Sequence, residues 1–233
     1  MLDSLKERVW RANLDLVRHG LVVLTFGNAS GIDRKKGLVA IKPSGVDYAD
    51  LKPADIVLVD LEGRVVEGKL VPSSDTPTHV ALFRAFPKAG GIVHAHSPYA
   101  TMFAQAAREI PCLGTTHADH FHGPVPTTRF LTRREAAGDY EANTGKVIVE
   151  RFTRLDPAAM PAVLVAGHGP FVWGNTPGAA VANAVALELV AKTALGTLSL
   201  DRSRRPLPGY ILEKHYLRKH GPHATYGQKG VKP

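Results

Sequence analysis

The pattern of hydrophobic and polar positions predicts short strands that alternate with helices. A first helix is expected over 3–18, because apolar residues recur there at helical spacing. Two short apolar runs, 21–26 and 37–41, predict strands joined by a polar stretch. The remaining predicted elements are a hairpin of 56–60 with 65–67, helices over 76–86 and 98–107, strands at 91–95 and 162–166, an interrupted helix over 133–151 with breaks at Gly138 and Gly145, a long helix over 176–195 and a basic helix over 210–219.

This order of elements favours an α/β fold with a mixed, largely antiparallel central sheet. Hairpins dominate the first third of the chain, and the later strands are separated by helices that must cover the sheet. The expected architecture is a three-layer α/β/α arrangement. No linker divides the chain, so we expect one domain over 1–233, with a basic C-terminal helix and tail from about residue 202.

Composition places the chain among ordinary globular proteins. It has 233 residues, of which 44% are hydrophobic and 21% charged. Cys112 is the single cysteine, which excludes an intrachain disulfide and favours a cytoplasmic location. The most apolar stretch, 178–200, includes Asn183, Glu188 and Lys192, so it predicts a buried helix and no membrane span.

Positive charge is concentrated near the C-terminus. The net charge is +8, and eight Lys or Arg residues against one acid, Glu213, give 202–233 a charge of +7. No DNA- or RNA-binding motif accompanies this segment, so we expect no nucleic-acid partner. A positive rim for an anionic small substrate is the preferred interpretation.

Histidines at strand ends indicate a metal site. His94 and His96 flank Ala95 after an apolar run, and side chains at i and i+2 of a strand point to the same face. His168 follows a second apolar run, and Asp75 precedes a predicted helix. Three imidazoles and a carboxylate suit Zn²⁺, with Mn²⁺ or Co²⁺ as alternatives.

Three segments have the chemistry of an anion site. They are Gly27-Asn28-Ala29-Ser30, Lys42-Pro43-Ser44-Gly45 and Ser73-Ser74, and each offers backbone N–H groups with an amide, hydroxyl or ammonium. Singly, each is also typical of a turn or a helix cap. No P-loop and no Gly-x-Gly-x-x-Gly motif is present, so no nucleotide cofactor is expected.

These motifs together resemble the class II aldolase/adducin family over essentially the whole chain. The set continues with Thr116-His117-Ala118-Asp119, Gly167-His168-Gly169-Pro170, the run 214–221 and Tyr226-Gly227-Gln228. Within the family, the Thr-His-Ala-Asp block and the histidine-rich C-terminal run resemble the members that epimerise L-ribulose 5-phosphate to D-xylulose 5-phosphate. The alternatives are a class II sugar-phosphate aldolase of the fuculose or rhamnulose type and a non-catalytic adducin-like module.

The resemblance also implies roles for individual residues. It assigns metal binding to Asp75, His94, His96 and His168, and acid/base chemistry to Asp119 and Tyr226, with His215 assisting. It implies a homotetramer with active sites between subunits, and a place in pentose catabolism. Substrate binding, of the phosphate especially, would fall to Gly27, Asn28, Lys42, Ser44, Gly45, Ser73, Ser74 and Thr116.

Overall fold

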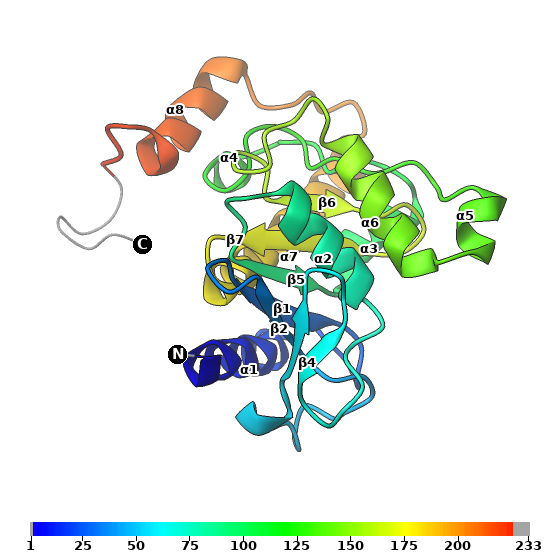
Figure 1. Ribbon diagram of the computed structural model, residues 1–233. Coiled ribbons are helices and arrows are strands. Elements are labelled where there is room, and N and C mark those ends of the chain that lie inside the picture. The colour runs from blue at the N-terminus through cyan, green and yellow to red at the C-terminus, as the bar shows by residue number, and fades with distance from the viewer. Residues whose placement is uncertain (1, 226–233) are drawn as a thin grey trace.

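The computed structural model describes residues 2–225 of the chain (Figure 1). The strands are β1 (Asn28–Asp33), β2 (Leu38–Ile41), β3 (Val57–Asp60), β4 (Val65–Glu67), β5 (Gly91–His94), β6 (Ala162–Leu164) and β7 (Pro170–Gly174). The helices are α1 (Leu2–Arg18), α2 (Thr76–Ala85), α3 (Pro98–Gln105), α4 (Thr115–Ala118), α5 (Arg133–Ala137), α6 (Tyr140–Arg151), α7 (Pro177–Leu200) and α8 (Gly209–His220).

The seven strands form one sheet in the order β4-β3-β2-β1-β5-β7-β6. Every pairing between these strands is antiparallel, and an isolated parallel bridge joins Thr127 to Leu164. The predicted fold class is therefore confirmed. The register places His94 of β5 between Asn28 of β1 and Phe171 of β7, which puts β5 at the centre of the site described below.

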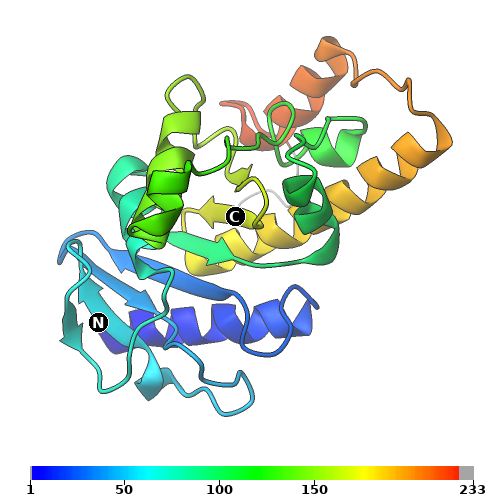
Figure 2. The same cartoon turned by 90° about the vertical axis from the view of Figure 1, so that its right-hand side faces the viewer.

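Alternation along β1 shows how the two faces of the sheet are covered. The Ser30 hydroxyl meets the His79 ring of α2 at 2.7 Å. The next residue, Gly31, faces the opposite side, where an added Cβ would lie about 3 Å from side chains of α1 and α7. Helices α1 and α7 thus cover one face, and α2 with α6 covers the other (Figures 1 and 2).

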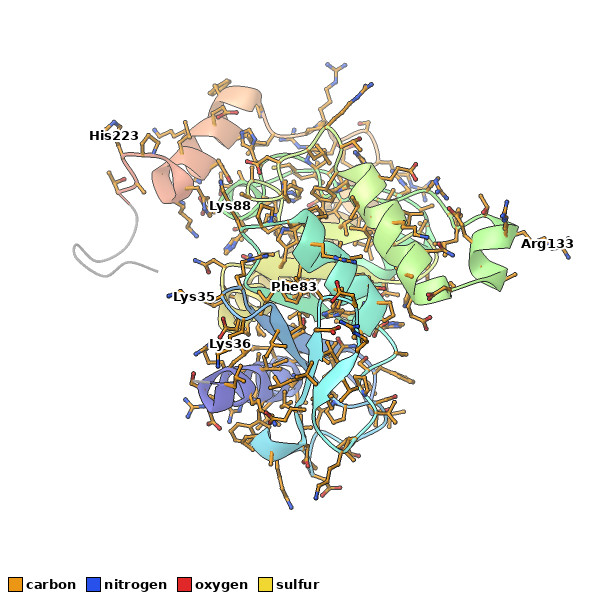
Figure 3. All side chains as sticks on the ribbon, in the orientation of Figure 1. Lys35, Lys36, Phe83, Lys88, Arg133 and His223 are labelled. Carbon is orange, nitrogen blue, oxygen red and sulfur yellow. The ribbon has the colours of Figure 1, made fainter. Side chains whose placement is uncertain are left out.

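The core follows this layering. Phe83 of α2, whose position Figure 3 shows, is fully buried against the sheet, whereas Lys35 and Lys36 lie in the exposed turn between β1 and β2. Helix α7 is long and apolar enough, by length and composition alone, to cross a membrane. In this fold it packs along β5 and β7, and the face toward the sheet is buried, including Ala180, Val181, Ala184, Leu187 and Ala191.

The prediction of a strand over 21–26 is wrong. The first strand begins at Asn28, and residues 21–27 form a loop in which Leu21 is buried but Val23 and Phe26 are 65% and 55% exposed. Positive φ angles at Leu24 (55°) and Gly27 (76°) turn the chain, so an extended strand cannot run through this segment.

Two further differences concern glycine and a short strand. Gly145 does not interrupt α6, which runs continuously through it. The glycine instead allows α6 to approach α2 closely, since an added Cβ would lie 2.7 Å from the Cβ of Ala81. Strand β7 was not expected from the sequence. It begins with a proline, Pro170, and only a short apolar run remains after the turn at Gly167.

Candidate metal and substrate site

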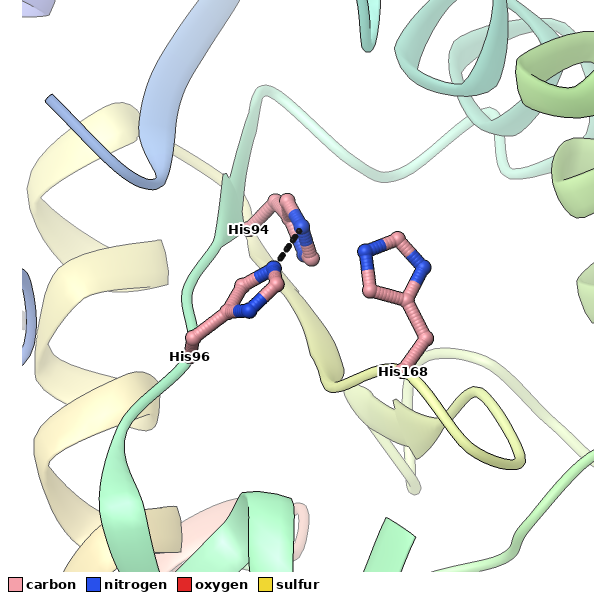
Figure 4. Close-up of side chains that lie close together, drawn as sticks. All are labelled: His94, His96 and His168. Atoms are coloured by element: carbon pink, nitrogen blue, oxygen red, sulfur yellow. Dashed lines mark hydrogen bonds between the residues drawn. The ribbon is translucent and has the colours of Figure 1, made fainter. Parts of the chain in front are cut away.

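Three imidazoles meet at the edge where β5 ends. His94 is the last residue of β5, His96 follows two residues later, and His168 stands in the tight turn between β6 and β7 (Figure 4). Each offers a ring nitrogen, and these atoms lie within 4.8 Å of one another. The Nε2 atoms of His94 and His96 are 3.0 Å apart. Two chain segments far apart in the sequence thus present three nitrogens to one point.

The environment of His94 fixes which nitrogen is available. Its Nδ1 lies 3.0 Å from the backbone oxygen of Pro170, and a carbonyl can only accept. Nδ1 therefore carries the proton, and Nε2 is left with a free lone pair toward the other two rings. Phe171 stacks on the His94 ring at 4.2 Å with an interplanar angle of 12°, so the ring is held in place.

Burial keeps the other two imidazoles neutral at physiological pH. It lowers the pKa of His168 to about 4, and the neighbouring His94 and His96 act in the same direction. The pKa of His96 is also lowered, first by burial and then by His94. Neutral imidazole is the form that binds a metal, so His96 and His168 need no proton loss near pH 7.

Asp75 lies beside this cluster but outside the group of atoms within 4.8 Å. It is the residue before α2, and its Oδ2 accepts a hydrogen bond of 2.7 Å from the Asn28 amide. Burial acts to raise the pKa of Asp75, but the charge interactions with His94 and His79 and the Asn28 hydrogen bond outweigh it. The pKa therefore lies below its ordinary value, and the carboxylate stays ionised.

All three predicted anion-binding segments converge on the same cleft. Its volume is about 390 Å³, and it lies between the loop before β1, the turn after β2, the start of α2 and the histidines. Its lining includes Gly27, Asn28, Lys42, Ser44, Gly45, Ser73, Ser74, Asp75, His94, His96 and His168. Residues from five separate parts of the sequence therefore share one polar cavity.

Lys42 contributes to this cleft from a buried position. The residue is only 1% exposed, and its ammonium donates to the backbone oxygen of Val46 at 2.6 Å. The same ammonium lies over the Tyr48 ring, whose hydroxyl donates to the oxygens of Phe26 and Gly27. Lys42 thus joins two loops of the cleft and places a positive charge behind its wall.

Three residues around the cleft were missed by sequence reasoning. Tyr140 and Glu141, at the start of α6, line it, and the Tyr140 hydroxyl lies 3.5 Å from Nδ1 of His168. His79 is fully buried, meets Phe171 edge-on and has no partner for Nε2 among residues 2–225. Burial lowers the pKa of His79 to about 3. Its place one helical turn after Asp75 is the signal that was available in the sequence.

The remaining predicted site residues lie elsewhere in the chain. Asp119 follows α4, and its carboxylate is bonded to His215 and Arg218 of α8. Thr116 lines a different cleft, between α4 and α7. Within the described part of the chain, neither Asp119 nor His215 lines the histidine cleft. Tyr226 lies outside the described residues.

Comparison with known proteins identifies relatives along the whole chain. A family model described as "Class II Aldolase and Adducin N-terminal domain" matches residues 7–195. L-ribulose-5-phosphate 4-epimerase UlaF of Salmonella paratyphi B is 51% identical over 228 residues, which cover 98% of this chain and 100% of that protein. The protein of the same name from Salmonella paratyphi C is 52% identical with the same coverage.

Solved structures agree with this assignment. An L-fuculose 1-phosphate aldolase superposes with a TM-score of 0.78 at 28% identity, covering 91% of this chain and 94% of that one. The L-fuculose-1-phosphate aldolase from Thermus thermophilus gives a TM-score of 0.67 at 26% identity, covering 87% of this chain and 100% of that one. Similarity therefore extends through both the sequence and the fold.

Proposed function

This chain belongs to the class II aldolase and adducin family, and from that premise we propose that it converts L-ribulose 5-phosphate to D-xylulose 5-phosphate. The observation that carries the proposal is the 51% identity, over 98% of the chain, to a relative named for this 4-epimerase activity. The cleft supports it, because a cluster of neutral imidazoles stands beside a wall of hydroxyl, amide and backbone N–H groups.

We propose that His94, His96 and His168, with Asp75 beside them, hold one divalent cation, and that this cation is Zn²⁺. The donor set fits, since the three nitrogens are mutually close, the His94 ring is oriented by the Pro170 carbonyl, and burial favours the neutral form of His96 and His168. Mn²⁺ and Co²⁺ are the alternatives. When bound, such an ion polarises carbonyl and hydroxyl oxygens and stabilises negative charge that develops on them.

The neighbouring groups are suited to hold the phosphate. Gly27, Asn28, Ser44, Gly45, Ser73 and Ser74 offer N–H and hydroxyl donors on one wall, and the buried charge of Lys42 favours an anion there. We propose that this grip keeps the substrate fragment in place while the bond to the rest of the sugar is open. A fragment that escaped would be an aldolase product.

The chemistry requires two proton-transfer groups. The hydrogen on C4 is not adjacent to the C2 carbonyl, so direct deprotonation at C4 is difficult, whereas removal of the C4 hydroxyl proton permits cleavage of the C3–C4 bond. The aldehyde then turns, and the bond re-forms with the opposite configuration. We propose that Asp119 and Tyr226 serve the two faces, with His215 assisting Asp119.

Assembly is part of the proposal. Asp119 does not line the cleft of its own chain, so a neighbouring subunit must supply it if it acts on the substrate. The resemblance to the family implies four subunits, and we propose a homotetramer with active sites between them. A phosphorylated sugar substrate and one buried cysteine suit an enzyme of the cytoplasm.

The test is incubation of the purified protein with L-ribulose 5-phosphate. D-xylulose 5-phosphate should form, and a chelator should abolish the activity. Aldolases share this fold, so an aldolase activity is the alternative function. Release of a free aldehyde phosphate is therefore measured in the same reaction. Aldehyde release without epimerisation would favour the aldolase, and absence of both activities in metal-loaded protein would favour a non-catalytic module.

A further inference from the structure

Helix α8 engages the carboxylate of Asp119 through a two-pronged ion pair. Arg218 donates from Nε to Oδ1 at 3.0 Å and from the terminal Nη2 to Oδ2 at 2.7 Å. This parallel arrangement is the fork geometry that a guanidinium provides and that a lysine ammonium cannot reproduce. The Asp119 side chain is 12% exposed and that of Arg218 is 37% exposed. The plane of the carboxylate is therefore fixed by its partner.

Other groups of α8 complete the surroundings. His215 approaches Oδ1 through Nδ1 at 3.1 Å, Lys219 lies 3.9 Å from Oδ2, and the ring of His220 reaches the backbone oxygen of Asp119 at 2.9 Å. On the side of α4, His117 and His120 are the titratable neighbours. The Arg218 fork is the one among these contacts that engages both carboxylate oxygens within hydrogen-bond distance.

We propose that Arg218 is a positioning residue, which holds the Asp119 carboxylate in the single orientation needed for proton transfer. The inference rests on the proposed function, in which Asp119 is an acid/base group. Arg218 does not touch the substrate in this proposal; it acts through Asp119. A carboxylate free to rotate would present its lone pair to the C4 oxygen in only a fraction of its orientations.

The same contact sets the ionisation of Asp119. Burial acts to raise the pKa of this carboxyl, but the hydrogen bonds from Arg218 and His215 outweigh it and hold the pKa below its ordinary range. Loss of the guanidinium should raise that pKa. The acidic limb of the pH profile of kcat/KM would then move to higher pH, because the ionised form is the base.

The experiment compares two replacements of Arg218. Arg218→Lys keeps the charge but loses the fork, and Arg218→Gln loses both. We expect kcat to fall by about tenfold or more in each, with KM and metal content little changed. The acidic limb should move upward in Arg218→Gln, and less so in Arg218→Lys. In an Asp119→Asn background, Arg218→Lys should add almost nothing, because both changes remove the same interaction.

Glu213→Gln is the matched control. Glu213 pairs with His122 at 2.7 Å, so it also docks α8 on the segment after α4, but it does not touch Asp119. An equal loss of kcat in Glu213→Gln would overturn the proposal in favour of general helix docking. So would wild-type kcat in both Arg218 variants, an effect confined to KM, or full additivity with Asp119→Asn. If the unchanged protein does not epimerise L-ribulose 5-phosphate, the proposed function itself fails.

Discussion

At the scale of single residues, His94 and His96 differ in how much of the fold depends on them. His94 is 2% exposed, stacked on Phe171 and bonded to Pro170, whereas His96 stands exposed at the end of the strand. The two histidines therefore have separate roles. In the proposed metal site both are ligands, whereas the packing of the sheet depends on His94.

A pair of variants tests this division. His96→Asn should lose the metal while the metal-free protein keeps its melting temperature, because His96 is an exposed residue outside the core. His94→Asn should lose the metal and also lower the melting temperature, because the stacked ring and its buried hydrogen bond disappear. The measurements are elemental metal analysis and thermal unfolding of the metal-free proteins. A stoichiometric metal content in His96→Asn would contradict the assignment.

Element positions that depend on local pattern were predictable, and those that depend on tertiary contact were not. Periodicity and proline placed α1, α2 and the β3–β4 hairpin within a few residues. The strand expected at 21–26 failed because Leu21 alone of its apolar residues is buried in the core, while the turn at Leu24 leaves Val23 and Phe26 exposed. The three clustered histidines could be recognised as a candidate metal site from their strand-end positions, whereas Glu141 had no local signal, since only the docking of α6 brings it to the cleft.

Two helical glycines illustrate this at the level of elements. A Cβ added at Gly145 of α6 would lie 2.7 Å from the Cβ of Ala81 in α2, whereas a Cβ added at Gly196 of α7 would have no neighbouring atom within 4 Å. Gly145→Ala should therefore destabilise the protein by about 1–3 kcal/mol through overpacking. Gly196→Ala should stabilise it by about 0.5–1 kcal/mol, because alanine favours the helix. Thermal unfolding measures both, and a melting temperature of Gly145→Ala equal to or above that of the parent protein would show that the α2–α6 contact yields without cost.

For the whole molecule, buried histidines predict how stability depends on pH. Burial lowers the pKa of His79 to about 3 and that of His117 to about 4, whereas the unfolded values are about 6.5. Below that pH the unfolded chain gains protons that the folded chain does not, so the free energy of unfolding should fall as the pH drops from about 6.5 toward 4. Thermal unfolding of metal-free protein between about pH 6.5 and pH 5 tests this.

The control for this pH dependence is a pair of histidine variants. His79→Gln removes one titrating group and should flatten the slope of melting temperature against pH. His19→Gln removes an exposed histidine of the same chain and should leave the slope unchanged. A slope in His79→Gln equal to that of the parent protein would assign the pH dependence to other groups.

The separation of Asp119 from the histidine cleft leads to a test of the whole assembly. If one subunit supplies the imidazoles and its neighbour supplies Asp119, then His96→Asn and Asp119→Asn damage different halves of each site. Each variant alone should be nearly inactive. In a ring of subunits mixed at random in equal amounts, about one quarter of the interfaces would pair an intact histidine cluster with an intact Asp119. Subunit exchange should therefore restore about one quarter of the parent activity, measured as D-xylulose 5-phosphate formation.

A chain carrying both substitutions, mixed with either single variant, should restore none, because no interface then carries both intact halves. No recovery in the first mixture, despite exchange demonstrated with labelled subunits, would mean that each chain builds its site alone.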